Sequence, residues 1–184
     1  VTAILVGDAL NTEAFNLIAN ASLSNDIKID LIKCLSFNGG INGMIIGQAI
    51  DCYFENQKLE LNQLEFLHIH KTARLIAASL KMGAIICEYD LSTQDKLYDF
   101  GIDLGLLFQI QDDIIDETCT EEQAGKTTQN DGSKNSFVNL LGLEGAIKSA
   151  NELALKCTNT LNTFDSNLKE SLEELLLKYI NRHK

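Results

Sequence analysis

The stretch from Gln109 to Asp116 constrains the fold most, because it places an acidic stripe on a helix that is otherwise apolar. It reads Gln-Ile-Gln-Asp-Asp-Ile-Ile-Asp, and Ile110 and Ile114 lie opposite the polar residues. At about 100° per residue, four polar side chains share roughly one quarter of the helix surface: Gln109, Asp112, Asp113 and Asp116. The last three are called the acidic stripe below. We therefore expect a helix that is buried except along this stripe.

Three carboxylates so close together resist ionisation unless something pairs with them. A divalent cation resolves this, and Mg²⁺ typically binds a few carboxylate oxygens together with waters and substrate phosphates. The stripe therefore predicts a Mg²⁺ site. The alternative is a solvated acidic face. Four apolar residues on the preceding turns favour burial instead: Leu104, Leu106, Leu107 and Phe108.

Composition favours one helical domain over residues 1–184. Apolar residues make up 45% of the chain, and proline, which would interrupt long helices, is absent. The net charge of −11 argues against a nucleic-acid partner. The five cysteines form no CxxC pair, which is typical of a reduced, cytoplasmic protein. No run approaches the ~18 apolar residues of a membrane span.

The hydrophobic pattern predicts helices throughout and no strands. The chain opens at Val1 directly into a helical pattern without a cap, so we expect it to be the carboxy-terminal portion of a longer protein, N-terminally incomplete. Ser92 to Asp95 has the form of a capping box, and Ser166 is a predicted N-cap. The predicted helices cover residues 1–21, 26–37, 40–56, 61–89, 92–118, 135–164 and 166–182.

Further candidate residues lie outside the stripe. Three glycines would share one face of the third predicted helix, beside Gln48 and Asp51: Gly40, Gly43 and Gly47. Glycine destabilises a helix, so close approach of another helix or of a ligand is the expected reason. Lys71 and Thr72 lie midway along the fourth helix, where an ordinary surface position is the alternative. Lys126 and Lys134 lie in or beside the polar loop after the stripe, where they could close over a metal-bound anion.

The chain resembles the carboxy-terminal part of bacterial trans-prenyl diphosphate synthases, of the farnesyl diphosphate synthase (geranyltranstransferase) type. Five elements carry the resemblance in the family's order: Gly7-Asp8-Ala9-Leu10, Gly43 to Asp51, His70-Lys71-Thr72, Phe108 to Asp116, and Gly125-Lys126 with Lys134. It implies an all-α helical bundle around a central cavity, of the isoprenoid synthase type. It also implies a homodimer.

The resemblance implies a Mg²⁺-dependent prenyltransferase. An allylic diphosphate (dimethylallyl or geranyl diphosphate) ionises, isopentenyl diphosphate attacks the cation, and a proton is lost to give farnesyl diphosphate. Asp112, Asp113 and Asp116 would hold Mg²⁺. Five residues would bind substrate: Lys71, Gln48, Asp51, Lys126 and Lys134. Catalysis would depend on Lys71, Thr72, Gln109 and Asp112, with Thr72 and Gln109 placing oxygen dipoles near the cation.

The family's first aspartate-rich motif and its isopentenyl diphosphate residues are not found in these 184 residues. We therefore expect residues 1–184 alone to be inactive. Three other functions remain open at this stage. One is a longer-chain (geranylgeranyl or polyprenyl) diphosphate synthase. The second is a non-catalytic helical partner subunit, which would not need an intact acidic stripe. The third is a terpene cyclase, which typically carries a different second metal motif.

Overall fold

The computed structural model describes residues 1–55, 57–118 and 135–180, and all regular structure within these ranges is helical. The predicted all-α fold class is confirmed. The helices are α1 (Thr2–Asn20), α2 (Asn25–Gly39), α3 (Met44–Tyr53), α4 (Leu61–His68), the π-helix η1 (Ile69–Ala73), α5 (Arg74–Ile86), α6 (Leu91–Thr118), α8 (Phe137–Leu161) and α9 (Ser166–Ile180).

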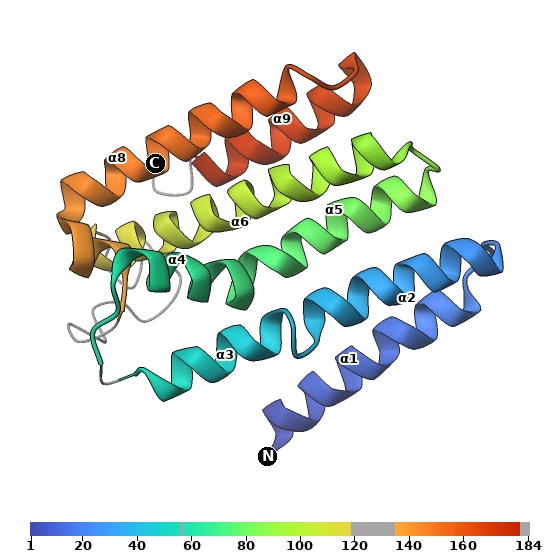
Figure 1. Cartoon of the computed structure of the whole chain (residues 1–184), viewed down its shortest axis with the longest axis horizontal. Coiled ribbons are helices and arrows are strands. Elements are labelled where there is room, and N and C mark those ends of the chain that lie inside the picture. The colour runs from blue at the N-terminus through green and yellow to red at the C-terminus, as the bar shows by residue number, and fades with distance from the viewer. Residues whose placement is uncertain (56, 119–134, 181–184) are drawn as a thin grey trace.

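The helices lie side by side around α6 (Figure 1). On one side α6 packs against α8 and α9. On the other it packs against η1 and α5, beyond which lie α2 and α3. α1 contacts α2 at the edge of the molecule, next to the amino terminus (Figure 1). The helix that carries the acidic stripe is therefore covered on two sides.

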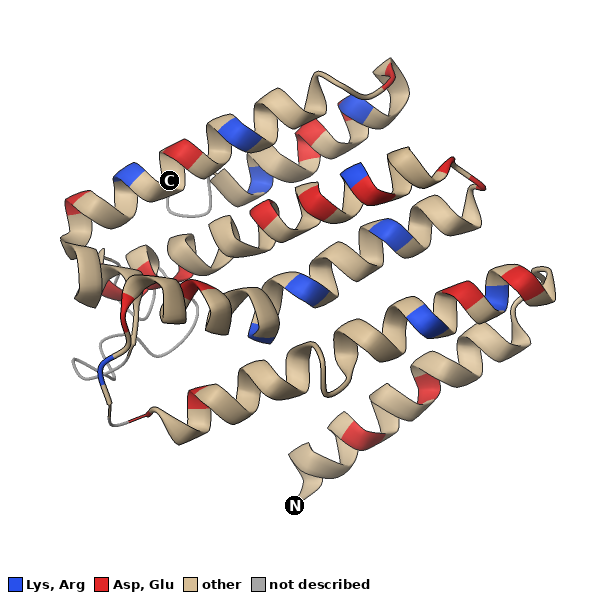
Figure 2. Ribbon diagram, viewed as in Figure 1, with Lys and Arg blue, Asp and Glu red and all other residues tan. Residues whose placement is uncertain are grey.

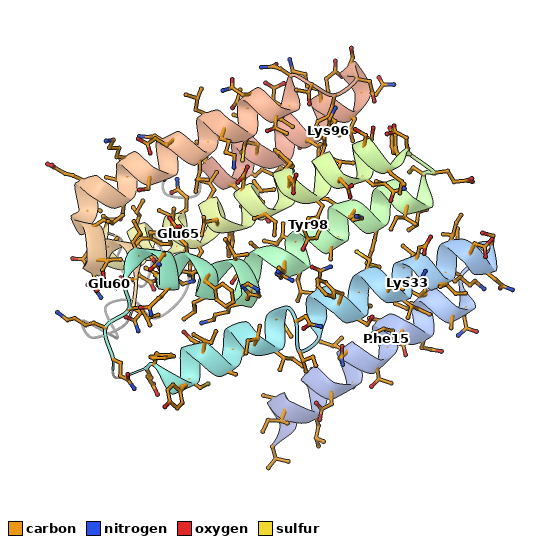
Figure 3. All side chains as sticks on the ribbon, viewed as in Figure 1. Phe15, Lys33, Glu60, Glu65, Lys96 and Tyr98 are labelled. Atoms are coloured by element: carbon orange, nitrogen blue, oxygen red, sulfur yellow. The ribbon has the colours of Figure 1, made fainter. Side chains whose placement is uncertain are left out.

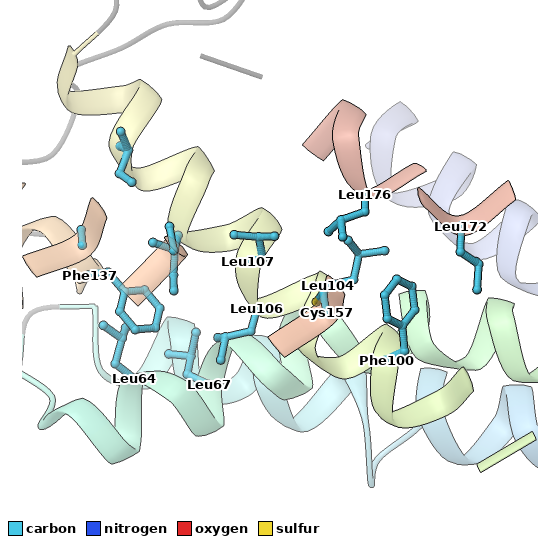
Figure 4. Packing of buried hydrophobic residues seen from close by; sticks show 14 of the residues in the cluster. Leu64, Leu67, Phe100, Leu104, Leu106, Leu107, Phe137, Cys157, Leu172 and Leu176 are labelled. Carbon is cyan, nitrogen blue, oxygen red and sulfur yellow. The ribbon is translucent and has the colours of Figure 1, made fainter. Parts of the chain in front are cut away.

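The main hydrophobic core surrounds α6 (Figure 4). Phe100, Leu104 and Leu107 are fully buried there. They pack in one cluster with Leu64 and Leu67 of α4 and with residues of α8 and α9. At the energies typical of burying large apolar side chains, about 1.5–3 kcal/mol each, this cluster fixes α6 firmly. Its stripe is thus presented from a rigid element.

A second, smaller cluster joins the amino-terminal helices to α5 through Ile18, Leu31 and Ile85. A polar contact supports it. Tyr98 of α6, labelled in Figure 3, donates a 2.6 Å hydrogen bond from its hydroxyl to Oδ1 of the buried Asn38 on α2. Acidic residues lie towards both ends of α6 (Figure 2). Within the described ranges, no helix is both long and apolar enough to cross a membrane.

The predicted fourth helix, residues 61–89, is not continuous. A five-residue π-helix separates α4 from α5 at Ile69–Ala73. A π-helix adds a residue to a turn, and such interruptions are frequent at functional sites. The sequence predicted one helix because an apolar, helix-forming stretch does not by itself reveal a single π-helical turn.

Two predicted caps are wrong by one or two residues. The carboxylate of Asp90 accepts hydrogen bonds from the backbone N–H and hydroxyl of Thr93, at 3.1 and 2.8 Å, so the Ser92 capping box does not form. The carboxylate of Asp165 accepts from the first backbone N–H groups of α9, so Ser166 is the first helical residue and not the cap. In both cases a carboxylate one or two residues before the predicted cap stabilises the helix start.

Candidate active site

The acidic stripe lies on a continuous part of α6, as predicted. Ile110 and Ile114, opposite the stripe, are only 1% and 3% exposed. The three stripe carboxylates are half-buried. The prediction of a helix buried on most of its surface is therefore confirmed.

The π-helix η1 brings Lys71 and Thr72 next to α6. The Thr72 hydroxyl donates a hydrogen bond to Oε1 of Gln109, with 3.2 Å between the oxygens. A π-helix shifts the side chains after it relative to a regular α-helix, which lets consecutive residues face α3 and α6. Two segments 37 residues apart in the sequence thus meet at the start of the acidic stripe.

On its other side, η1 packs tightly against α3. A Cβ atom at Gly47 would lie 2.2 Å from the backbone nitrogen of Lys71, so only glycine fits. The prediction that a neighbouring helix explains this glycine agrees with the structure. Gly40 and Gly43, however, lie in the turn before α3 and not on it. The sequence pattern had placed all three on one helical face.

The close approach of η1 and α3 allows an ion pair. The ammonium of Lys71 donates to Oδ2 of Asp51 at 2.6 Å, and both side chains are partly exposed. Arg74, just after η1, donates to the backbone oxygen of Asn42 at 2.8 Å and ties the turn before α3 to α5. Lys71 is therefore held at a defined place while its ammonium still reaches solvent. Gln48, on the next turn of α3, is exposed.

The amino terminus of α8 completes the described site, and the sequence reasoning missed its contribution. Oδ2 of Asp113 accepts a 2.8 Å hydrogen bond from the backbone N–H of Phe137, the first residue of α8. Ser136 is the N-cap, accepting from the N–H of Asn139 at 3.0 Å. Asn135 bonds three backbone groups of the segment between α3 and α4. The sequence predicted a helix from residue 135, but the contact of its first residue with Asp113 depends on tertiary packing.

Burial and neighbouring charges perturb two titratable groups here. Burial, opposed by the hydrogen bonds from Phe137 and Gln109, raises the pKa of Asp113 to about 6. Burial also lowers the pKa of His68 to about 4, helped by the positive charge of Lys71. His68 is therefore neutral at pH 7. Its ring stacks on that of Phe137 at a centroid distance of 5.6 Å.

The donor set of the stripe fits Mg²⁺. Carboxylate oxygens are the ligands this cation prefers, and partial burial of three of them in one quarter of a helix calls for a counter-charge. In the described part of the chain, no three His, Cys, Asp or Glu side chains lie together so that they could hold a metal ion by themselves. Mg²⁺ usually keeps several waters and substrate phosphate oxygens and takes only one or two carboxylates.

The structure brings together Lys71, Thr72 and Gln109 with the acidic stripe, and places Asp51 beside Lys71. Lys126 and Lys134 lie outside the described residues. Two hollows lie elsewhere. One of about 760 Å³ lies between α6 and α8, near Asp103 and Lys156, and one of about 310 Å³ lies between α3 and α4, near Phe54 and Phe66.

Comparisons with known proteins agree with this geometry. The family model described as polyprenyl synthetase matches residues 1–175. The chain is 40% identical over its whole length to a farnesyl diphosphate synthase of Micrococcus luteus, of which it covers 63%. It is 37% identical over 89% of its length to a chloroplastic geranylgeranyl pyrophosphate synthase of Capsicum annuum, covering 46% of that protein.

A solved structure agrees with these sequence comparisons. The crystal structure of a geranyltransferase from Helicobacter pylori, complexed with magnesium and isoprenyl diphosphate, superposes with a TM-score of 0.91. The two sequences are 52% identical over 98% of this chain and 61% of that one. The chain thus spans less than two thirds of the length of these relatives.

Proposed function

Because the chain belongs to the polyprenyl synthetase family, we propose that it carries part of the active site of a Mg²⁺-dependent prenyltransferase. The enzyme condenses dimethylallyl or geranyl diphosphate with isopentenyl diphosphate and makes farnesyl diphosphate. One observation supports this most strongly. The π-helix places Lys71 and Thr72 against the helix that carries the acidic stripe, and the Thr72–Gln109 hydrogen bond joins the two elements.

The chemistry needs no nucleophilic side chain, because the departing diphosphate must be stabilised rather than attacked. Lys71 supplies a compact positive charge suited to a phosphate oxygen. Its pairing with Asp51 keeps the ammonium in place before the substrate arrives. The resemblance assigns the same charge-neutralising role to Lys126 and Lys134, and places Gln48 beside the substrate.

The oxygen atoms of Thr72 and Gln109 stabilise the positive charge that develops on the allyl group. Fixed dipoles aimed at a developing charge are among the strongest sources of rate enhancement. When bound, Mg²⁺ at the acidic stripe supplies Lewis-acid stabilisation of the leaving diphosphate. The reaction also needs an apolar environment that keeps water from the cation.

A longer-chain product is the second candidate. The resemblance to a geranylgeranyl pyrophosphate synthase supports it, because that enzyme shares the same site chemistry and differs in its product. The residues described here act on the diphosphate and the cation, and both are common to every chain length. Product analysis is therefore the measurement that separates the two.

A cytoplasmic homodimer is the assembly that fits the resemblance. α1 carries several apolar side chains that are more than half exposed in the single chain, as expected of a helix that packs against another subunit or segment: Ile4, Leu5, Val6, Leu10 and Leu17. The described cysteines Cys34, Cys52, Cys87 and Cys157 are free thiols, as expected in a reducing compartment.

Release of inorganic diphosphate from geranyl and isopentenyl diphosphates tests the proposal. Lys71→Gln in the natural protein should lower kcat/KM about 100-fold, the usual cost of removing one preorganised stabilising group. Lys33→Gln is the matched control, because Lys33 also pairs with an aspartate but lies on the exposed face of α2. Equal rates for both variants, or no diphosphate release by the wild-type protein with Mg²⁺, would refute the proposal. The second result would favour a non-catalytic partner subunit.

A further inference from the structure

Helix α3 carries Asp51 but has few apolar contacts that hold it in place. Within the described ranges, Gly47 is its only buried residue, and Ile50 packs partly buried against the main core. Ile45 and Ile46 are 50% and 37% exposed. Because packing of a buried apolar face is what usually fixes a helix in a protein, polar contacts contribute much of what places α3 against η1.

Arg74 holds the amino-terminal end of α3. The chain passes from α2, beside α5, to α3, beside η1, through a turn of residues 40–43 (Figure 1). Nη1 of Arg74 donates a 2.8 Å hydrogen bond to the backbone oxygen of Asn42 in this turn. Its guanidinium also lies over the ring of Phe37 in α2, with 5.5 Å from Cζ to the ring centroid. Arg74 therefore contacts the chain on both sides of the end of α2.

The guanidinium is suited to making both contacts at once. It is planar, so it donates from its edge while its face stacks on an aromatic ring. Nε of Arg74 is shielded from solvent and has no hydrogen-bond partner among the described residues, so protein atoms enclose this part of the side chain. A lysine ammonium is a single point charge and lacks this double geometry.

One continuous segment, η1 followed by α5, contacts α3 at three places along its length. Arg74 reaches Asn42 just before α3 begins. Gly47 packs directly on the backbone of Lys71. The Lys71 ammonium reaches Asp51 near the other end of α3 at 2.6 Å. Without the contact at Asn42, α3 is free to pivot about Gly47, and such a pivot moves Asp51 relative to Lys71.

We infer that Arg74 is a positioning residue: it fixes the start of α3, so that Asp51 holds the Lys71 ammonium where the diphosphate binds. This inference rests on the proposed function. Arg74 acts through Asp51 and does not itself contact the substrate. It thus assigns a role in the reaction to a residue outside the acidic stripe and outside the predicted site residues.

Substitution of Arg74 in the natural protein tests this role. Arg74→Met removes the donor and the charge but keeps the apolar stem, and should lower kcat/KM about tenfold by displacing Lys71 slightly. Arg74→Lys, whose ammonium can still donate to Asn42, should stay within about threefold of wild type. Lys81→Met is the matched control. Lys81 also lies on α5, 5.7 Å from the ring centroid of Tyr98 and paired with Asp95, but it does not contact α3. It should stay within about twofold of wild type.

A double-mutant cycle tests whether Arg74 acts through Asp51. Asp51→Asn removes the charge that holds Lys71, so the position of α3 then has little effect on the ammonium. In this background Arg74→Met should lower kcat/KM less than about twofold. The same cycle is measured on binding of inorganic pyrophosphate with Mg²⁺, which needs no turnover. A loss of the same size in both backgrounds would overturn the inference, because Arg74 would then act independently of Asp51, as a residue that binds substrate does.

Hydrogen exchange shows directly whether Arg74 holds the start of α3. The Ile45 amide donates to the Gly40 oxygen at 3.2 Å, across the turn that Arg74 contacts. Arg74→Met should raise its exchange rate about tenfold or more and leave the amides of α9 unchanged, and Lys81→Met should change neither. An equal rise throughout the protein, or no rise at Ile45, would contradict the inference.

These measurements also separate the inference from the proposed function. A wild-type protein with no turnover, in which Arg74→Met still changes amide exchange and pyrophosphate binding as expected, would refute the proposed function alone. A wild-type protein with normal turnover, in which Arg74→Met changes neither activity nor exchange, would refute the role of Arg74 alone.

Discussion

Gly47→Ala should damage both stability and activity, because the π-helix has no room to move. The added Cβ would lie 2.2 Å from the Lys71 nitrogen and 2.6 Å from its Cα. Ordinary contact begins at 3.4 Å, so α3 and η1 must separate by about 1.2 Å. On its far side η1 is equally tight, because a Cβ at Gly105 would lie 2.4 Å from Cα of Ala73. The strain therefore falls on α3 and on the Lys71–Asp51 ion pair.

Overpacking of this kind costs about 3 kcal/mol at the upper end of its usual range. Replacing glycine with alanine in a helix offsets about 1 kcal/mol. We expect a net loss of about 2 kcal/mol in the free energy of unfolding, measured by urea denaturation. Misplacement of Lys71 by about 1 Å should also lower kcat/KM about 100-fold.

Gly83→Ala is the matched control for this prediction. Gly83 lies in α5, and nothing stands within 4 Å of its missing Cβ. The control should be up to about 1 kcal/mol more stable than wild type, with unchanged activity. If Gly47→Ala proved as stable and as active as Gly83→Ala, the packing argument for the position of Lys71 would be wrong.

Two further predictions concern buried polar groups. His68→Phe should reduce the loss of stability at low pH. Because burial lowers the pKa of His68 to about 4, the unfolded chain takes up a proton between pH 7 and pH 5 that the folded protein does not. The wild type therefore loses about 2 kcal/mol in the free energy of unfolding over this range, and the variant should not. Urea denaturation of both proteins at the two pH values isolates this effect, because Asp113 contributes equally to both and cancels in the comparison. The same change in the free energy of unfolding with pH in both proteins would contradict the prediction. Tyr98→Phe should cost about 1–3 kcal/mol, because it leaves the buried Asn38 oxygen without the hydroxyl that it accepts from. A loss below about 0.5 kcal/mol in the same assay would show that this hydrogen bond is not important.

The helical fold and the stripe were predictable because both follow from periodicity. Ile110 and Ile114 repeat at helical spacing opposite the acidic stripe, and burial of one face follows from that spacing alone. The π-helix was not predictable in this way. No residue type marks the π-helical turn within 61–89, yet this turn determines where Lys71 and Thr72 point.

The partners of the site residues were also beyond the sequence pattern. Asp51 and Lys71 were each expected near the substrate, but their 2.6 Å contact depends on how closely α3 approaches η1. Asp113 looked equivalent to its neighbours, since all three are aspartates on one face. Its hydrogen bond from the Phe137 backbone N–H, 24 residues further along the chain, depends on where α8 packs. Contacts between distant segments depend on tertiary packing, which a local pattern does not contain.

Product identification tests the central claim most directly. The natural protein is incubated with geranyl diphosphate, isopentenyl diphosphate and Mg²⁺, and the prenyl alcohol released by phosphatase is identified. We expect farnesol in the presence of Mg²⁺ and no prenyl product when Mg²⁺ is chelated. A longer alcohol would retain the mechanism and select the longer-chain synthase. Absence of any prenyl product from a folded protein with Mg²⁺ would contradict the claim that Lys71, Thr72, Gln109 and the acidic stripe form part of a prenyltransferase active site.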